Sequence, residues 1–163
     1  MTNAKLNVLL ATALDKAADD RFRAARIMKR FALAQALAVE EQLTDEDTRI
    51  VAAAAALYDL DDKAANPADD SKEFSPIVIT GYVKDLLDDA NLATFEASAV
   101  ASLVAMQKHG LSIENNLHRL LQDADALSGV TAHTTIEEAA AIKDTLTHDS
   151  AKRRLALMFG LED

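Results

Sequence analysis

Apolar residues along most of this chain recur at intervals of three and four positions, the spacing that places side chains on one face of an α-helix. Near the start, the residues with this spacing are Leu6, Leu9, Leu10, Ala13 and Leu14. Asp19 and Asp20 then interrupt the rhythm. A second run continues through Phe22, Ala25, Met28, Ala32 and Gln35. The pattern predicts a first helix, a break at the two aspartates, and a long second helix that ends near Glu41.

Residues that favour helix ends mark where further helices begin. Thr44-Asp-Glu-Asp47 has the form of a capping box with Asp in the acidic position, so it predicts a third helix that ends near Tyr58. Ser75-Pro76 predicts a fourth helix to about residue 90, because proline is favoured in the first helical turn. Further helices are predicted over about 94–109 (followed by Gly110), over 113–125, from Thr134 or Thr135, and from Asp149 to near Gly160. The sequence thus predicts seven or eight helices and no sheet.

The composition favours a single all-α domain over residues 1–163. Half of the chain is hydrophobic, but much of that share is alanine, and only 4% of the residues are aromatic. Four glycines and two prolines leave few of the turn residues that β proteins use, which favours closely packed helices. At this length the chain can bury a sizeable core.

The formal net charge of −10 opposes nonspecific binding to nucleic acid and to anionic membranes, since both need positive charge at the protein surface. The uncharged stretch over residues 97–107 is too short to span a bilayer, and no signal-peptide pattern opens the chain. The absence of cysteine excludes disulfides and thiolate chemistry and fits a cytoplasmic protein. We therefore expect neither a nucleic-acid partner nor a membrane partner.

Four short segments share an order and spacing with a known family. They are Arg23-Ala-Ala-Arg26-Ile27, Leu57-Tyr58-Asp59-Leu60, Met106-Gln-Lys-His109-Gly and Leu121-Gln-Asp123-Ala-Asp125-Ala-Leu. Over roughly residues 18–132 they resemble the HD-domain segments His-x-x-Arg-Val, His-Asp, a later helix-ending His, and Gln-Asp-Ala-Asp-Arg-Leu-Asp. The last segment is the most specific match. The resemblance implies an HD-type helical bundle in which the second, third, fifth and sixth helices converge on one pocket.

The resemblance also implies phosphoester hydrolysis at that pocket. Two histidines and two aspartates of the family hold a divalent metal (Mn²⁺, Fe²⁺ or Mg²⁺), which polarises a phosphoryl oxygen and activates a bound water. The matching positions here are Arg23, Tyr58, Asp59 and Asp125. Arginine stays protonated, and tyrosine, with a reference pKa of about 10, is a poor ligand for Mg²⁺ or Mn²⁺ near neutral pH. The remnant ligands Asp59 and Asp125 therefore predict a degenerate metal site, and no bound cofactor is expected.

One hypothesis follows from these replacements. The guanidinium of Arg23 could take the space and the charge of the lost metal and pair with Asp59 and Asp125 across the bundle. Tyr58 would then be a core residue whose hydroxyl finds a local partner. The alternative is that Arg23 lies on the solvent side of its helix.

His109, Lys63 and Arg26 are the remaining candidates for contact with a substrate. By the resemblance, His109 faces the phosphate side of the pocket as a proton donor or phosphate contact, although a helix-end histidine that favours the helix dipole is the alternative. Lys63 lies in the polar, non-periodic stretch 60–75, and a stretch this long is often functional in a compact domain. Lys63 could bind phosphate, or it could be a solvated lysine among aspartates.

Arg26 holds the arginine position of the first segment and lies on one helical face with Arg23 and Arg30. These three residues could form a small anion patch, but internal ion pairing explains them better than nucleic acid does in so acidic a chain. The other histidines are predicted to be surface or cap residues: His118, His133 and His148.

Three functions stay open from the sequence. The leading one is an HD-type phosphohydrolase-like protein with a degenerate metal site, weakly active or inactive, which binds a small phosphorylated ligand or has a regulatory role. The runner-up is an active metal-dependent phosphohydrolase of a small phosphorylated metabolite or nucleotide, which would use Asp59, Asp125, His109 and Asp123. The third is a helical interaction domain, which predicts a homo-oligomer or a co-purifying partner chain.

Overall fold

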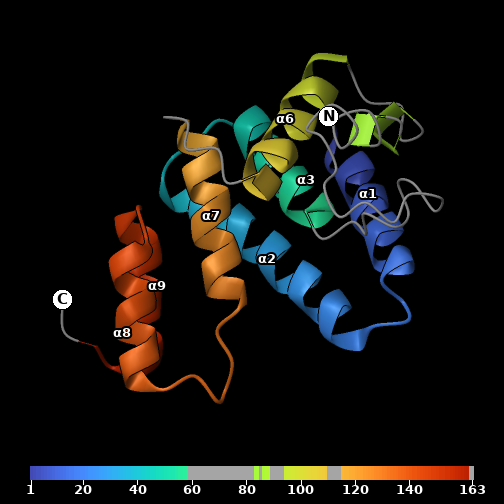
Figure 1. Ribbon diagram of the computed structural model, residues 1–163. Helices are drawn as coiled ribbons and strands as arrows, with labels where there is room; N and C mark the ends of the chain where they lie inside the picture. Colours follow the sequence, from blue (N-terminus) through green and yellow to red (C-terminus); the bar gives the residue numbers. More distant parts are fainter. Residues whose placement is uncertain (59–82, 85, 89–93, 110–114, 162–163) are drawn as a thin grey trace.

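The computed structural model describes residues 1–58, 83–84, 86–88, 94–109 and 115–161, with only the backbone at residues 94, 95, 108 and 109. Regular structure in these residues is entirely helical (Figure 1). The helices are α1 (Asn3–Lys16), α2 (Arg21–Glu40), α3 (Asp45–Leu57), α6 (Thr94–His109), α7 (Asn116–Ser128), α8 (Ile136–Thr145) and α9 (Asp149–Phe159). Short helical stretches at 83–84 and 86–88 fall within the predicted fourth helix, whose other residues lie outside the described ones, as does the stretch 60–75. The predicted all-α class is confirmed.

Side-chain caps fix most of the helix boundaries where the sequence predicted them. Asp20 accepts hydrogen bonds from two amides in the first turn of α2, and Thr44 accepts one at the start of α3. Thr135 and Glu138 form a full capping box at α8, which satisfies two amides that the helix itself cannot bond. Gly160 ends α9 with a φ of 63°, the left-handed conformation that glycine adopts without strain.

Helix α7 begins and ends three residues later than the sequence predicted. The side chain of Asn115 accepts hydrogen bonds from the amides of Leu117 and His118, so the cap lies beyond residue 113. The helix continues past Asp125 to Ser128 and stops at Gly129. Asn115 accounts for this difference, since asparagine is among the residues most favoured at a helix N-cap.

Helix α2 buries a different face from the one its apolar rhythm predicted. On the predicted face, Phe22 is 73% exposed and Met28 is 55% exposed. The buried residues are Ile27, Arg30, Phe31, Ala34, Leu37 and Ala38. A charged residue stands within this stripe, and alanines occur on both sides of the helix, so hydrophobicity alone does not identify the buried face.

Helix α3 lies at the centre of the molecule (Figure 1). Eight consecutive residues, from Ile50 to Leu57, are buried, as expected for a helix surrounded on all sides. Its neighbours are α1, α2, α6 and α7, and five successive alanines, 52–56, let them approach closely. Of the four helices that the resemblance predicted to converge on one pocket, α3 and α7 pack against each other and against both α2 and α6. The common pocket stays a prediction.

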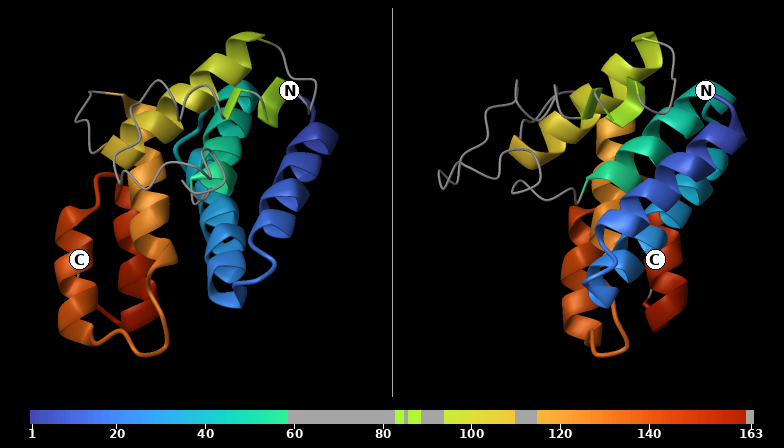
Figure 2. Two further views of the ribbon diagram at one scale, coloured as in Figure 1. Left: turned by 45° about the vertical axis from the view of Figure 1, so that its right-hand side comes forward. Right: turned by 90° about the vertical axis from the view of Figure 1, so that its right-hand side faces the viewer.

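The last two helices form an antiparallel hairpin outside this central group (Figure 2). Helix α9 packs against α7 and α2, whereas α8 packs mainly on α9. Arg153 and Arg154 of α9 pair with Glu40 at the end of α2. None of the described helices combines the length and the apolar character that a bilayer crossing requires.

The capping box of α8 gives a first test of the fold. Replacing Thr135 with Ala removes the acceptor for the Glu138 amide, and we expect the free energy of unfolding to fall by about 1 kcal/mol. Urea denaturation followed by circular dichroism measures this change. Thr12→Ala is the matched control, because the Thr12 hydroxyl only bonds the Val8 carbonyl within α1 and caps no helix. Equal losses in both variants would contradict a capping role for Thr135.

Candidate functional site

A fully buried guanidinium joins three helices at the centre of the fold. Arg30 of α2 has no exposed surface, and its Nε donates to the carbonyl oxygen of Ala55 in α3 at 2.9 Å. Its Nη1 donates to Asp125 Oδ1 of α7 at 2.8 Å. The guanidinium carbon also lies 4.5 Å from the ring centroid of Tyr58. The arginine therefore has a carbonyl, a carboxylate and an aromatic face as partners, which is how a buried cation is stabilised.

A second guanidinium reaches the same carboxylate from the solvent side. Arg26 Nη2 lies 3.2 Å from Asp125 Oδ1, and Arg26 Nε donates to Ser128 Oγ at 3.4 Å. The Arg26 side chain is 47% exposed, whereas that of Asp125 is only 16% exposed. One carboxylate thus faces two fixed positive charges, one buried and one at the surface.

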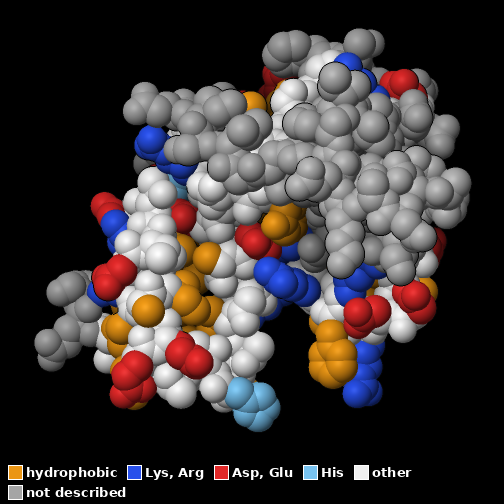
Figure 3. Space-filling view, viewed as in Figure 1, with side chains coloured by type: hydrophobic (Ala, Val, Ile, Leu, Met, Phe, Trp, Pro, Cys, Tyr) orange, Lys and Arg blue, Asp and Glu red, His pale blue; other side chains and the backbone are white. Residues whose placement is uncertain are grey.

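The exposed edge of this cluster is positively charged. Lys and Arg side chains gather over the N-terminal half of α2 in the space-filling view (Figure 3), and that half carries Arg21, Arg23 and Arg26. Arg26 uses one N–H for Ser128 and one for Asp125, out of the five that a guanidinium has. Donors therefore remain for an anion that approaches from solvent.

The pairing predicted for Arg23 at Asp125 is made instead by Arg30 and Arg26. Arg23 lies seven residues before Arg30, which is about 10 Å along the helix axis. It is half-buried and has contacts of its own. Tyr58 is half-buried and provides an aromatic face to the guanidinium. The overlooked signal was that Arg30 stands at helical spacing between Ile27 and Ala34, both of which are buried.

The two aspartates of the Gln-Asp-Ala-Asp segment serve opposite sides of α7. Residues two apart on a helix point about 200° away from each other. Asp125 faces Arg30, whereas Asp123 accepts hydrogen bonds from the amides of Thr147 and His148 at 2.9 and 2.8 Å. The hydrolase alternative grouped Asp123 with Asp125 in one site, but the two side chains lie on opposite sides of α7. Asp123 has a structural role at the start of α9.

His148 extends this second polar cluster. Its Nδ1 lies 2.8 Å from Asp123 Oδ2, and its Nε2 lies 3.0 Å from Asn116 Oδ1. His148 was predicted to be a surface or cap residue. It is the N-cap residue of α9, but it is buried. The cluster ties the α8–α9 connection to α7.

His118 is buried, which corrects the prediction that it is a surface or cap residue. Only 1% of it is exposed, and burial lowers its pKa below the ordinary value. Its Nε2 finds no hydrogen-bond partner among the described residues. His118 precedes Asp125 by seven residues, so both lie on one side of α7. That spacing was the sequence signal that could have identified His118 as a residue of the inner face of α7. His133 is exposed, as predicted.

The described residues around Asp125 do not fit a bound metal ion. Two guanidiniums occupy the surroundings of its carboxylate, and no group of three His, Asp or Glu side chains in the described part of the chain could hold an ion. Asp59 and Lys63 lie outside the described residues, as does the side chain of His109 at the end of α6. Their predicted roles therefore stay predictions.

Comparison with protein-family models, with curated proteins and with solved structures finds no match to this chain. The likeness to HD-domain proteins thus rests on the four sequence segments alone. What the structure adds is the chemistry at three of them. Arg26, Tyr58 and Asp125 meet around the buried guanidinium of Arg30, which none of the four segments contains.

Removing the buried guanidinium should destabilise the fold strongly. Arg30→Met keeps much of the side-chain volume but removes the donor to the Ala55 carbonyl and the buried partner of Asp125, which keeps its pair with half-exposed Arg26. We expect a loss of about 3 kcal/mol in the free energy of unfolding. Arg26→Met is the matched control. Its half-exposed ion pair is screened by solvent, so its loss should stay under about 1 kcal/mol.

The double variant Arg30→Met/Asp125→Leu completes this test. It also removes the carboxylate that Arg30→Met leaves without its buried partner, so it should be more stable than Arg30→Met alone. Urea denaturation of the wild type, Arg30→Met, Asp125→Leu and the double variant gives the coupling energy between the two residues. Additive losses for Arg30 and Asp125 would contradict a direct pair.

Burial of His118 makes the stability depend on pH. Because its folded pKa lies below the unfolded value of about 6.5, the unfolded chain takes up a proton there that the folded chain does not. Stability should therefore fall as pH decreases through 6.5 by at most about 1.4 kcal/mol per pH unit, relative to His118→Leu. Urea denaturation between about pH 7.5 and 5.5 measures the difference. His133→Leu, an exposed control, should leave the pH dependence of the wild type unchanged.

Proposed function

We propose that this chain is an HD-type phosphohydrolase-like protein whose metal site has degenerated, and that it acts as a binding or regulatory module for a small phosphorylated ligand. The observation that carries the proposal is the buried Arg30 guanidinium on Asp125. Asp125 holds the position of the last metal ligand in the resemblance. A permanent cation already neutralises it.

Electrostatics supports the loss of the metal. A divalent ion ~4 Å from a guanidinium is repelled by roughly 8 kcal/mol at an effective dielectric constant of 20. Arg30 cannot turn away to relieve this repulsion, because it is enclosed by α2, α3 and α7 and bonded to two of them. A metal at Asp125 would therefore need the core to open.

The solvent side of the same cluster supports an anionic ligand. Arg26 is half exposed, keeps unused N–H donors, and shares its carboxylate with Arg30. Guanidinium groups bind phosphate oxygens through two parallel hydrogen bonds, which suits a small phosphorylated molecule. Arg21 also lies in the N-terminal half of α2, over which Lys and Arg side chains are visible (Figure 3), on a chain whose net charge is −10.

A helical interaction domain is the second candidate, and one observation favours it. Large apolar side chains are exposed on the C-terminal hairpin, notably Leu157 (79% exposed) and Ile136 (59%). Exposed apolar surface of this kind is typical of protein contacts where it is contiguous. Self-association or a co-purifying partner, without any phosphate-dependent stabilisation, would favour this function.

Metal content tests the first half of the proposal. After equilibration with excess Mn²⁺ and removal of free ion, the wild-type protein should retain none, because Arg30 and Arg26 already neutralise Asp125. Asp125→Asn serves as the control. Retention of near one ion per wild-type chain, together with its loss in Asp125→Asn, would overturn the proposal in favour of an active metal-dependent phosphohydrolase.

Ligand-dependent stabilisation tests the second half. Pyrophosphate or ADP at ten times its Kd should stabilise the fold by about 1.4 kcal/mol and raise Tm by roughly 3–6 °C. Arg26→Gln should abolish the shift, whereas Arg153→Gln, which removes the same charge from α9, should preserve it. Equal shifts in both variants would place the bound anion elsewhere. Phosphate release during incubation would instead indicate turnover.

A further inference from the structure

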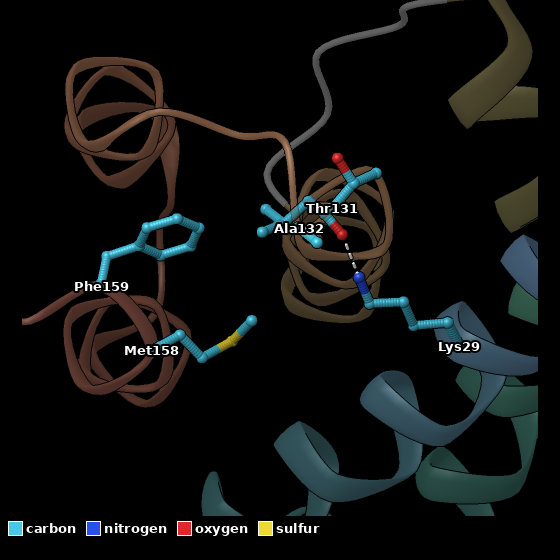
Figure 4. Close-up of a pocket in the computed structure, with 6 residues that line it drawn as sticks. Lys29, Thr131, Ala132, Met158 and Phe159 are labelled. Carbon is cyan, nitrogen blue, oxygen red and sulfur yellow. Dashed lines mark hydrogen bonds between the residues drawn. The ribbon is translucent and has the colours of Figure 1, made fainter.

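A cleft of about 420 Å³ separates the end of α9 from α2 and from the connection after α7 (Figure 4). Its lining residues are Lys29, Val130, Thr131, Ala132, Met158 and Phe159. This volume falls within the range of small-molecule pockets, roughly 300–1,000 Å³. Lys29 precedes Arg30 in α2, but it is turned by about 100° toward the α7–α8 connection. The cleft is therefore distinct from the Arg30 cluster.

One side of the cleft is apolar. Met158 and Phe159 extend from α9 toward the connection, where Ala132 lies opposite them (Figure 4). Val130 also lines the cleft. Met158 is 59% exposed in this position. Its unbranched thioether can adapt to an apolar chain that lies against it.

The other side is Lys29, which has no carboxylate partner in the described part of the chain. Lys29 Nζ donates to the carbonyl oxygen of Val130 (Figure 4), which leaves two of its three N–H donors. Among the described residues no Asp or Glu forms an ion pair with it, although the chain carries a net charge of −10. Burial lowers the pKa of Lys29. A single negative charge at Nζ would stabilise this ammonium.

We propose that this cleft binds a small carboxylate with an unbranched alkyl chain. The carboxylate accepts from the two remaining donors of Lys29, and the chain lies along Met158 and Phe159. A monoanion matches the single ammonium, whereas a phosphate dianion would leave one charge without compensation. This site does not involve Arg26, so it is independent of the phosphorylated ligand proposed above.

Methionine methyl NMR with octanoate tests this site directly. The chain has four methionines, and Met158→Leu identifies the Met158 signal by its loss. Octanoate should shift the Met158 signal saturably with a Kd on the order of 1 mM, as expected for a ligand of about ten heavy atoms. Each methylene added from hexanoate to decanoate should tighten binding by about two- to fourfold.

Two comparisons test the role of Lys29. Lys29→Gln should weaken octanoate binding by about tenfold, whereas Lys152→Gln, which removes the same charge from α9 outside the cleft, should leave it unchanged. Octan-1-ol should bind the wild type at least about tenfold more weakly than octanoate, because it lacks the charge. This second comparison decides the question even if Lys29→Gln fails to fold.

Three outcomes would overturn the proposal. The first is no saturable shift of Met158 up to about 10 mM octanoate. The second is equal affinity for octanoate and octan-1-ol. The third is sedimentation with phosphatidylglycerol vesicles in the absence of octanoate binding, which would assign this face to a lipid surface.

Discussion

The packing of the central helices depends on one buried guanidinium. Helix α3 consists largely of alanines on the faces it presents to its neighbours, and alanine side chains offer little shape to fix how helices pack. Arg30 supplies that specificity, because its Nε donates to the Ala55 carbonyl of α3 and its Nη1 donates to the Asp125 carboxylate of α7. The desolvation of the cation is offset only while these partners are in place, so the three helices must keep their relative positions.

Helix α7 transmits this constraint to the rest of the molecule. Asp125 faces the Arg30 side, while Asp123, two residues earlier, holds the start of α9 through Thr147 and His148. A sequence motif that resembles a metal site thus carries two structural contacts on opposite faces of one helix. The α8–α9 hairpin takes its position from the second contact, and the cleft at Lys29 lies where that hairpin ends.

Local signals in the sequence predicted the elements better than the site. Caps such as Thr44 and Thr135 act within one turn, so the residues themselves are enough to place the start of a helix. The buried face of α2 is set by the helices packed against it. Because this face contains the charged residue Arg30, the hydrophobic pattern did not identify it. The burial of His118 likewise depends on the helices packed around it, so the sequence of α7 alone did not predict it. Of the candidate site residues, Arg26, Tyr58 and Asp125 do come together, but around an arginine that the motifs do not include.

The proposed loss of hydrolysis together with anion binding rests on the chemistry of the two arginines. In the proposed site, Arg30 neutralises Asp125 from the core, and the charge of half-exposed Arg26 is left to attract a phosphorylated ligand at the solvent edge. Guanidiniums have no vacant coordination position, however, and they cannot lower the pKa of a bound water as a metal does. They are also part of the chain, so neither chelation nor metal supply changes the charge of the site. Such a site is suited to hold an anion and release it unchanged.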